Sequence, residues 1–186
     1  MTTLIVLIVG AAIAVYLINL FNKLVKSRQL SEEGWSGIDV QLKRRADLVP
    51  NLVETVKGYA GHERALFDEI AELRTQVGRL AESDVAGRGQ LENALSGALT
   101  KLMALAEAYP DLKASGNFRE LQTTLAAVED EIQMARRYYN GATRNLNVLV
   151  ESFPSNLVAQ AFGLHQRDYF EIGDADRAVP EVGFSQ

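Results

Sequence analysis

The sequence predicts an all-α protein in which an N-terminal transmembrane helix precedes an elongated antiparallel helical bundle of three long helices plus a short fourth. The chain begins with an apolar run long enough to cross a bilayer. Beyond that run, apolar residues recur three and four positions apart through three long stretches, and no stretch shows the convincing alternation of a strand. Only 14 glycines and 4 prolines interrupt the 186 residues.

Composition indicates a folded, acidic protein. Hydrophobic residues make up 47% and charged residues 23% of the chain, and its net charge is -5. An acidic chain offers no basic field for a phosphate backbone, so nucleic acid is not expected as a partner. Because the chain has no cysteine, disulfides and thiolate metal sites are excluded.

The apolar run covers residues 4–21 and follows a short tail, residues 1–3. Asn19 is its one strongly polar side chain, and as a helix the run would be about 27 Å long. No basic residue precedes the run and no small-residue cleavage site ends it, which favours a retained anchor over a signal peptide. Residues 4–21 are therefore expected to contact membrane lipid.

Charges and small residues further describe this anchor. Lys23, Lys26 and Arg28 follow the run, and the positive-inside rule then places the C-terminal domain in the cytoplasm and the N-terminus outside. Gly10 and Ala14 form a small-xxx-small pair, which either packs two anchors together or is an ordinary part of a lipid-facing helix.

A connector over residues 22–34 is expected to separate the anchor from a cytoplasmic bundle over residues 35–172. Ser31 resembles a helix N-cap followed by acidic residues, and Gly34 and Gly37 would loosen the chain there. These features predict a hinge beside the membrane. Residues 173–186 are expected to form a flexible C-terminal tail.

The first long stretch runs from Trp35 to Leu80 with a seven-residue repeat, as in a coiled coil. The repeat keeps its phase through Pro50, which favours a kinked helix over a separating loop. A continuous helix of this length would span about 69 Å. Two charged residues, Arg45 and Glu63, interrupt the otherwise apolar seam.

Two further helical stretches follow a turn predicted at residues 83–89. One runs from Leu91 to Tyr109, where Pro110 ends it, and the other runs from Phe118 to Phe153, where Pro154 ends it. Residues 156–164 are expected to form the short fourth helix.

Charges on an apolar seam are costly unless they are paired, so Arg45 and Glu63 are expected to find partners on another stretch. The candidates are Lys57, Glu107, Glu129 and Arg136. A slender bundle also leaves flanking apolar residues exposed unless a fourth helix or a second copy covers them. These flanking residues are Ala46, Val53, Ala60 and Phe67. The sequence thus predicts a homo-oligomer, with Arg45, Pro50, Glu63, Glu129 and Arg136 among the contact residues.

Two short segments have alternative interpretations. Tyr109, Asp111 and Lys113 belong to a corner that is either a rigid turn or an exposed recognition loop for an unidentified protein. The basic run at residues 43–45 is either a lipid-binding patch or a solvated face with one seam arginine. Its distance from the bilayer, about 33 Å along a straight helix, favours the second interpretation.

No catalytic motif is apparent. His62 lacks a second histidine at the spacing of zinc proteases, and neither His62 nor His165 follows a glutamate by three residues, as a di-iron site would require. Gly-x-Ser-x-Gly, phosphate-loop and GxGxxG motifs are also absent. The sequence therefore predicts no enzyme activity, no cofactor and no metal.

The chain resembles the LemA family of bacterial membrane proteins. The resemblance rests on residues 41–53 (QLKRRADLVPNLV), 106–113 (AEAYPDLK) and 135–140 (ARRYYN), with Phe153 and Pro154. It implies an N-terminal transmembrane helix in the bacterial inner membrane, an antiparallel helical bundle in the cytoplasm and no established catalytic activity.

Together these features predict a membrane-anchored, self-associating scaffold without catalytic activity, which organises or shapes the membrane. The alternative is an adaptor that tethers a protease or a signalling protein at the membrane.

Overall fold

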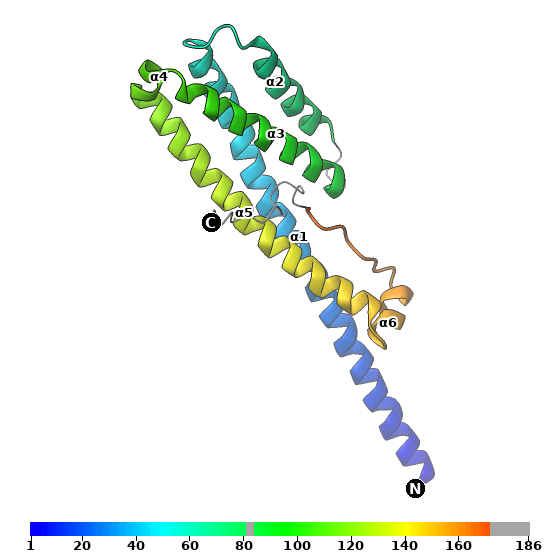
Figure 1. Ribbon diagram of the computed structural model, residues 1–186. Coiled ribbons are helices and arrows are strands. Elements are labelled where there is room, and N and C mark those ends of the chain that lie inside the picture. The colour runs from blue at the N-terminus through cyan, green and yellow to red at the C-terminus, as the bar shows by residue number, and fades with distance from the viewer. Residues whose placement is uncertain (81–83, 172–186) are drawn as a thin grey trace, which may run out of the picture. The chain divides into compact units, whose positions relative to one another are not determined.

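The structure, a computed structural model, describes residues 1–80 and 84–171. Most of the described residues are helical and none of them forms a strand, which confirms the all-α class. The tail predicted at residues 173–186 lies outside them. The helices are α1 (Thr2–Lys57), α2 (Arg64–Arg79), α3 (Val85–Glu107), α4 (Pro110–Ala114), α5 (Gly116–Glu151) and α6 (Ser155–Ala161), as labelled in Figure 1.

Helix α1 runs without interruption from Thr2 to Lys57. The helix start expected at Ser31 is therefore wrong, and residues 22–34 are as helical as the residues on either side. Ser31 and Gly34 have buried positions inside the helix rather than at an end. Packing of this helical face offsets the poor intrinsic helix propensity of glycine.

The chain divides into two compact units. Unit 1 comprises Met1–Leu42 and Asp130–Tyr169, and unit 2 comprises Lys43–Glu129 with the residues from Phe170 onward. Helices α1 and α5 contribute residues to both units.

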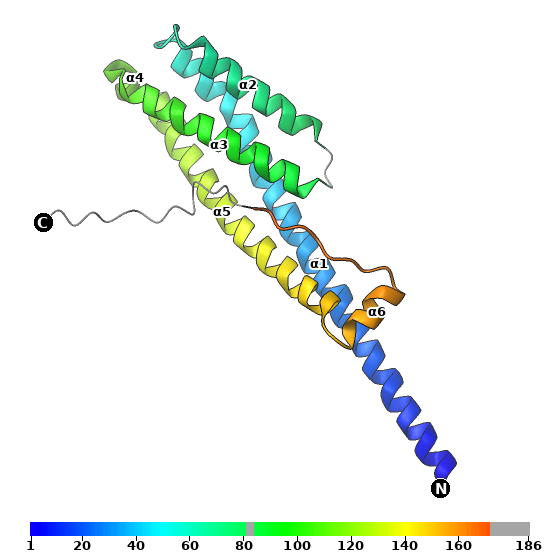
Figure 2. The ribbon, with the colours of Figure 1, turned by 45° about the vertical axis from the view of Figure 1, so that its right-hand side comes forward.

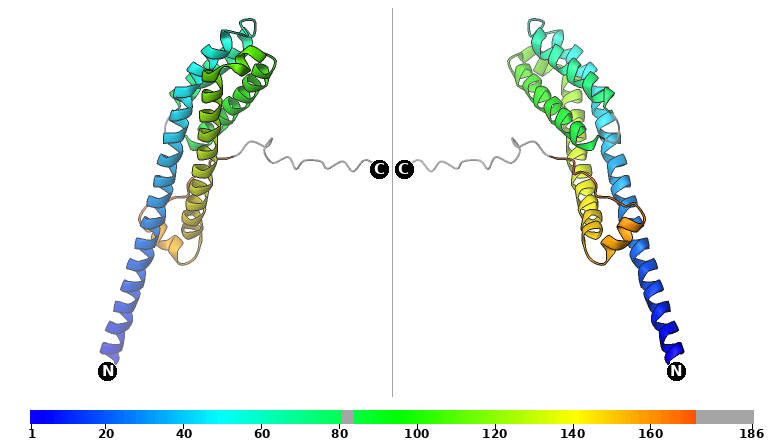
Figure 3. Two further views of the ribbon diagram at one scale, coloured as in Figure 1. Left: turned by 90° about the vertical axis from the view of Figure 1, so that its left-hand side faces the viewer. Right: turned by 90° about the vertical axis from the view of Figure 1, so that its right-hand side faces the viewer.

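In unit 1, α1 and α5 run antiparallel and α6 folds back beside α1 (Figure 3). The Ser31 hydroxyl lies 2.8 Å from that of Thr143, whereas Trp35, one turn later, packs its ring against Tyr139, one turn earlier. A small apolar core joins α6 to α1. It contains Leu24, Val158, Ala159 and Leu164.

Gly34 allows α1 and α5 to approach closely. A Cβ atom at this position would lie 2.9 Å from the backbone Cα of Tyr139, which is closer than side chains tolerate. Gly37, one turn further along α1, has open space where its Cβ would be. The two glycines that were expected to form a hinge therefore differ: Gly34 is required for packing and Gly37 is not.

In unit 2, α2 lies beside α3, and α3 leads into α4 (Figures 1 and 2). The parts of α1 and α5 that belong to this unit complete its core. The core residues are Val49, Leu52, Val53, Val56, Ala60, Phe67, Ile70, Leu95, Ala98, Leu99, Leu102, Ala106, Leu112, Phe118 and Leu125. Three of the flanking residues that were expected to need a cover, Val53, Ala60 and Phe67, are thus buried within the chain.

The continuous helix predicted from Trp35 to Leu80 is wrong, because α1 ends at Lys57 and α2 starts at Arg64. The intervening turn contains Gly58 and Gly61, each of which costs a helix about 1 kcal/mol relative to alanine. Ala60 is buried in this turn and its N–H donates to the carbonyl of Val56. The apolar repeat continues through the turn because both helices place residues in the same core.

Helix α1 continues through Pro50, as its sequence predicted. Proline has no N–H, so the carbonyl of Ala46, four residues earlier, loses its usual partner in the helix. The side chain of Arg74 on α2 supplies a donor instead, with its Nε 3.1 Å from the Ala46 oxygen. The proline therefore creates an acceptor that helps to attach α2.

The turn expected at residues 83–89 is shorter than predicted. Ser83 lies outside the described residues, and α3 already begins at Val85. Asp84 caps this helix by accepting a hydrogen bond of 2.9 Å from the N–H of Gly87.

The different surroundings of Gly34 and Gly37 lead to opposite expectations for alanine substitutions. Gly34→Ala should destabilise unit 1 by about 1–3 kcal/mol because two backbones must separate. Gly37→Ala should raise the free energy of unfolding by about 0.5–1 kcal/mol, the usual gain in a helix. Chemical unfolding of the full chain in detergent, followed by circular dichroism, measures both. Equal effects of the two substitutions would contradict the close approach at Gly34.

Candidate functional site

The first part of α1 exposes a continuous apolar surface. Its large hydrophobic side chains between Leu4 and Ile18 are 45–70% exposed, and none of the most apolar window of this helix is buried. Gly10 and Ala14 lie on the same exposed segment. A soluble surface rarely leaves so large an apolar area uncovered, whereas a lipid-facing helix requires it. This segment is a candidate membrane span by length and composition.

The exposed segment passes directly into the core of unit 1. Leu20 and Phe21 are half-buried, and Leu24, one turn further on, is completely buried against α6. Lys23 and Lys26 remain exposed at this transition. The end of the apolar run therefore coincides with the beginning of packed protein.

Unit 2 contains a buried ion cluster around Arg45. The guanidinium of Arg45 is 1% exposed and binds the carboxylate of Glu92 on α3 and that of Glu129 on α5, the latter at 2.7 Å. It also donates to the Ser96 hydroxyl and, at 3.2 Å, to the backbone carbonyl of Glu92. One side chain on α1 thereby links three helices.

Burial raises the pKa of Glu92, against the opposing attraction of Arg45. The two effects work in opposite directions because desolvation disfavours the carboxylate while the guanidinium stabilises it. Such a pair adds little to the free energy of unfolding compared with apolar residues of similar size, but removing one member leaves an uncompensated buried charge.

The structure brings together only some of the predicted seam residues. Glu129 was one of the candidate partners of Arg45 and does contact it, whereas Glu92 was missed because it lies next to the apolar positions of its stretch. No local signal identified Glu92, because its pairing with a residue on another helix is set by the fold. Glu63 is exposed at the start of α2, so its expected place on a buried seam is wrong.

The other proposed contact residues are scattered. Lys57 forms an exposed ion pair with Glu54, and Arg136 is buried in unit 1. Pro50 is partly buried, and its role is the one described for Ala46 and Arg74. Whether any of these positions contacts another copy stays a prediction.

The predicted corner consists of Tyr109 and the short helix α4. Tyr109 packs against the core of unit 2 and Leu112 is completely buried, while Asp111 and Lys113 are exposed. Proline at the first helical position fits this short turn of helix. The arrangement agrees with a rigid turn whose polar side chains face solvent.

Of the basic run at residues 43–45, Lys43 and Arg44 are exposed and Arg45 is buried. This pattern agrees with a solvated face that carries one seam arginine. In unit 1, His165 is exposed, as is His62 in unit 2. Within residues 1–80 and 84–171, no group of three or more His, Asp or Glu side chains could hold a metal ion.

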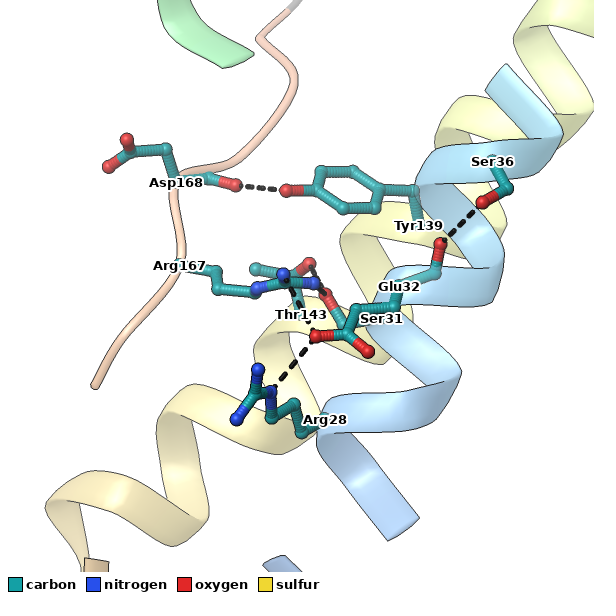
Figure 4. A network of polar contacts seen from close by, with 8 residues as sticks. All are labelled: Arg28, Ser31, Glu32, Ser36, Tyr139, Thr143, Arg167 and Asp168. Carbon is teal, nitrogen blue, oxygen red and sulfur yellow. Dashed lines mark hydrogen bonds and ion pairs between the residues drawn. The ribbon is translucent and has the colours of Figure 1, made fainter. Parts of the chain in front are cut away.

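A polar network in unit 1 fixes the segment that follows α6 across α1 and α5 (Figure 4). Asn147 binds the backbone of Arg167 through two hydrogen bonds of 2.9 Å, and the Tyr139 hydroxyl donates to the carbonyl of Asp168 at 2.7 Å. Burial raises the pKa of Tyr139 above its ordinary value. Glu32 accepts from both Arg28 and Arg167. Sequence patterns did not reveal this network, because most of its contacts join residues that are far apart in the sequence.

The sequence pattern of the LemA family matches residues 34–184, which is most of the chain. The chain belongs to the LemA family. The match begins inside α1 and includes the Arg45 cluster and the α4 corner. It confirms the resemblance found in the sequence.

Individual relatives of this LemA-family chain are distant but cover most of it. A magnetosome protein, MamQ 2 of Paramagnetospirillum magneticum, is 27% identical over 95% of this chain and 75% of its own length. Magnetosome protein MamQ of Magnetospirillum gryphiswaldense is 24% identical over 87% and 70%. Protein LemA of Metamycoplasma hominis is 26% identical over 84% and 71%.

None of these names denotes an enzyme. Together with the exposed apolar segment of α1, the family and its relatives indicate a membrane-associated protein in which no catalytic function is known.

The Arg45 cluster makes a double substitution informative. Glu92→Leu alone should lower the free energy of unfolding by about 3–5 kcal/mol, because a buried guanidinium loses its main partner. Adding Arg45→Met should restore most of that loss. Denaturant unfolding of the full chain in detergent measures both.

Lys101→Met serves as the matched control, since the Lys101–Glu69 pair is exposed. It should change the free energy of unfolding by at most about 1 kcal/mol. If Glu92→Leu were as mild as this control, the cluster would not hold a buried charge.

Proposed function

We propose that this chain is a single-pass, membrane-anchored helical scaffold without catalytic activity, whose copies associate and organise the bacterial inner membrane. The observation that carries this proposal is the exposed apolar start of α1, which continues as a packed helix of unit 1. One element thus joins the bilayer to the helical domain.

The charges beside the apolar run support one orientation. Lys23, Lys26 and Arg28 all lie on its C-terminal side. The positive-inside rule then gives an outside N-terminus and a cytoplasmic domain.

The continuity of α1 also restricts the orientation of the helical domain relative to the anchor. A flexible connector would let the domain reorient, whereas an uninterrupted helix transmits the orientation of the anchor to unit 1. Tethering to a two-dimensional bilayer further raises the effective concentration of copies, so weak contacts suffice for association.

The outer face of α5 offers a surface for such contacts. Met134, Tyr138, Gly141 and Val148 recur three, four and seven residues apart, and all four are exposed in unit 1. Their large side chains are 46–52% exposed. This apolar stripe, together with Gly10 and Ala14 on the anchor, replaces Arg45 as the main candidate for self-association, because Arg45 already has partners within its own chain.

The alternative, an adaptor for a protease or a signalling protein, rests on the α4 corner. The charged side chains of Asp111 and Lys113 are exposed there, while Leu112 and Tyr109 pack in the core. The corner therefore has an internal structural role, and the scaffold is the better-supported proposal.

Cysteine crosslinking tests self-association directly, because the natural chain has no cysteine. In proteoliposomes of the full chain, Met134→Cys should form disulfide-linked dimers on mild oxidation, several-fold more than Gln133→Cys, an exposed position to the side of the stripe.

Equal, background-level crosslinking of the two variants, with a monomeric particle in nanodiscs, would overturn the scaffold. A cysteine at the α4 corner, Lys113→Cys, separates the alternatives in whole cells, since an adaptor would yield a crosslinked product with a different protein there.

A further inference from the structure

We infer that the corner between α5 and α6 inserts into the bilayer interface and forms a second lipid contact beside the span. The corner is defined by Phe153, Leu157 and Phe162. This inference rests on the proposed function, because it takes residues 4–21 as membrane-spanning.

The corner exposes unusually large apolar side chains. Phe153 is 79% exposed, Leu157 is 57% exposed and Phe162 is 62% exposed. Single apolar residues are common on protein surfaces, but here three large ones lie within ten residues, on and beside one seven-residue helix. Val158 and Ala159, which are buried neighbours on the other face of α6, already fill its contact with α1, so Phe153 and Leu157 are not needed for that packing.

The corner lies beside the last turn of the apolar run. The Phe162 ring packs against the Phe21 ring with 4.5 Å between their centroids. Leu20 and Phe21 also border the small core that α6 forms with Leu24. Figure 3 shows the α5–α6 turn on the side of unit 1 toward the N-terminal part of α1.

This position sets the depth of the corner in a bilayer. A helical run of about 27 Å nearly matches a hydrocarbon core of about 30 Å, so Phe21 lies near the boundary between hydrocarbon and headgroups. A patch in contact with Phe21 lies at the same level. Aromatic rings favour this depth, and apolar side chains there are removed from water.

Nearby charges fit the headgroup layer. Lys23 and Lys26 are exposed immediately beyond the apolar run, where their ammonium groups can reach lipid phosphates. The acidic side chain closest in sequence, Glu151, already accepts a hydrogen bond of 2.6 Å from Gln166. The chemistry around the corner therefore suits a lipid surface.

Two points of attachment would restrict unit 1 more than a span alone. The span fixes the depth of α1 but leaves rotation about its axis free. Insertion of the corner selects the rotation that turns α6 toward the bilayer.

Spin labels on single cysteines test the depth of the corner in the full chain. The labelled positions in nanodiscs are Leu157→Cys for the corner, Val9→Cys for the span and Val40→Cys as the aqueous control. Val40 is 56% exposed and belongs to the same unit, about 28 Å along α1 from Phe21. The measured quantity is the ratio of collision rates with oxygen, which concentrates in lipid, and with a water-soluble nickel chelate.

The inference predicts a ratio at Leu157→Cys several-fold higher than at Val40→Cys and below that at Val9→Cys. If the ratio at Leu157→Cys equals that at Val40→Cys while the ratio at Val9→Cys indicates lipid, the inferred lipid contact of the corner is wrong and the membrane span is supported. If the ratio at Val9→Cys itself indicates water, residues 4–21 do not span the membrane, and both the proposed function and the inferred lipid contact are wrong. Spin–spin broadening at Leu157→Cys with low access to both reagents would show a second copy on the corner and overturn the lipid contact.

Discussion

The continuity of α1 is the constraint on which the rest of the structure depends. Within a bilayer, every backbone N–H and C=O must be satisfied inside the segment, which a helix achieves. In the proposed function, α1 continues past the membrane boundary, which avoids a helix end at that level. In unit 1, the other helices pack on α1. Gly34 allows α5 to lie close to α1, and Leu24 packs against α6.

Unit 2 depends on a different interaction, the buried charge of Arg45. A guanidinium at 1% exposure is tolerated only where several acceptors are already placed around it, and here they come from α3 and α5. Such clusters stabilise only the arrangement of helices that pairs every charge, whereas a purely apolar interface would also allow other arrangements. We interpret Arg45 as a residue that fixes the register of α1 within its own chain, in agreement with the partner on another stretch that the sequence predicted.

The sequence predicted the apolar run, the helical class and the approximate limits of α3, α5 and α6, because these depend on local composition and periodicity. It failed where tertiary packing prevailed over local signals. Glycines suggested a hinge at Gly34, but packing against Tyr139 keeps that segment helical. The turn after Lys57 was not predicted because the apolar repeat continues across it, since α1 and α2 both place residues in the same core. Glu92 and the backbone acceptors around Arg167 were not detectable, because a residue's partner across helices is set by the fold and not by its neighbours in sequence.

Amide hydrogen exchange of the full chain in nanodiscs tests the continuity of α1 most directly. The structure predicts strong, unbroken protection from residue 4 through residue 42, including residues 22–34 where a connector was expected. Protection over residues 4–21 and again from residue 35, with fast exchange over residues 22–34 between them, would contradict a single helix that joins the anchor to unit 1.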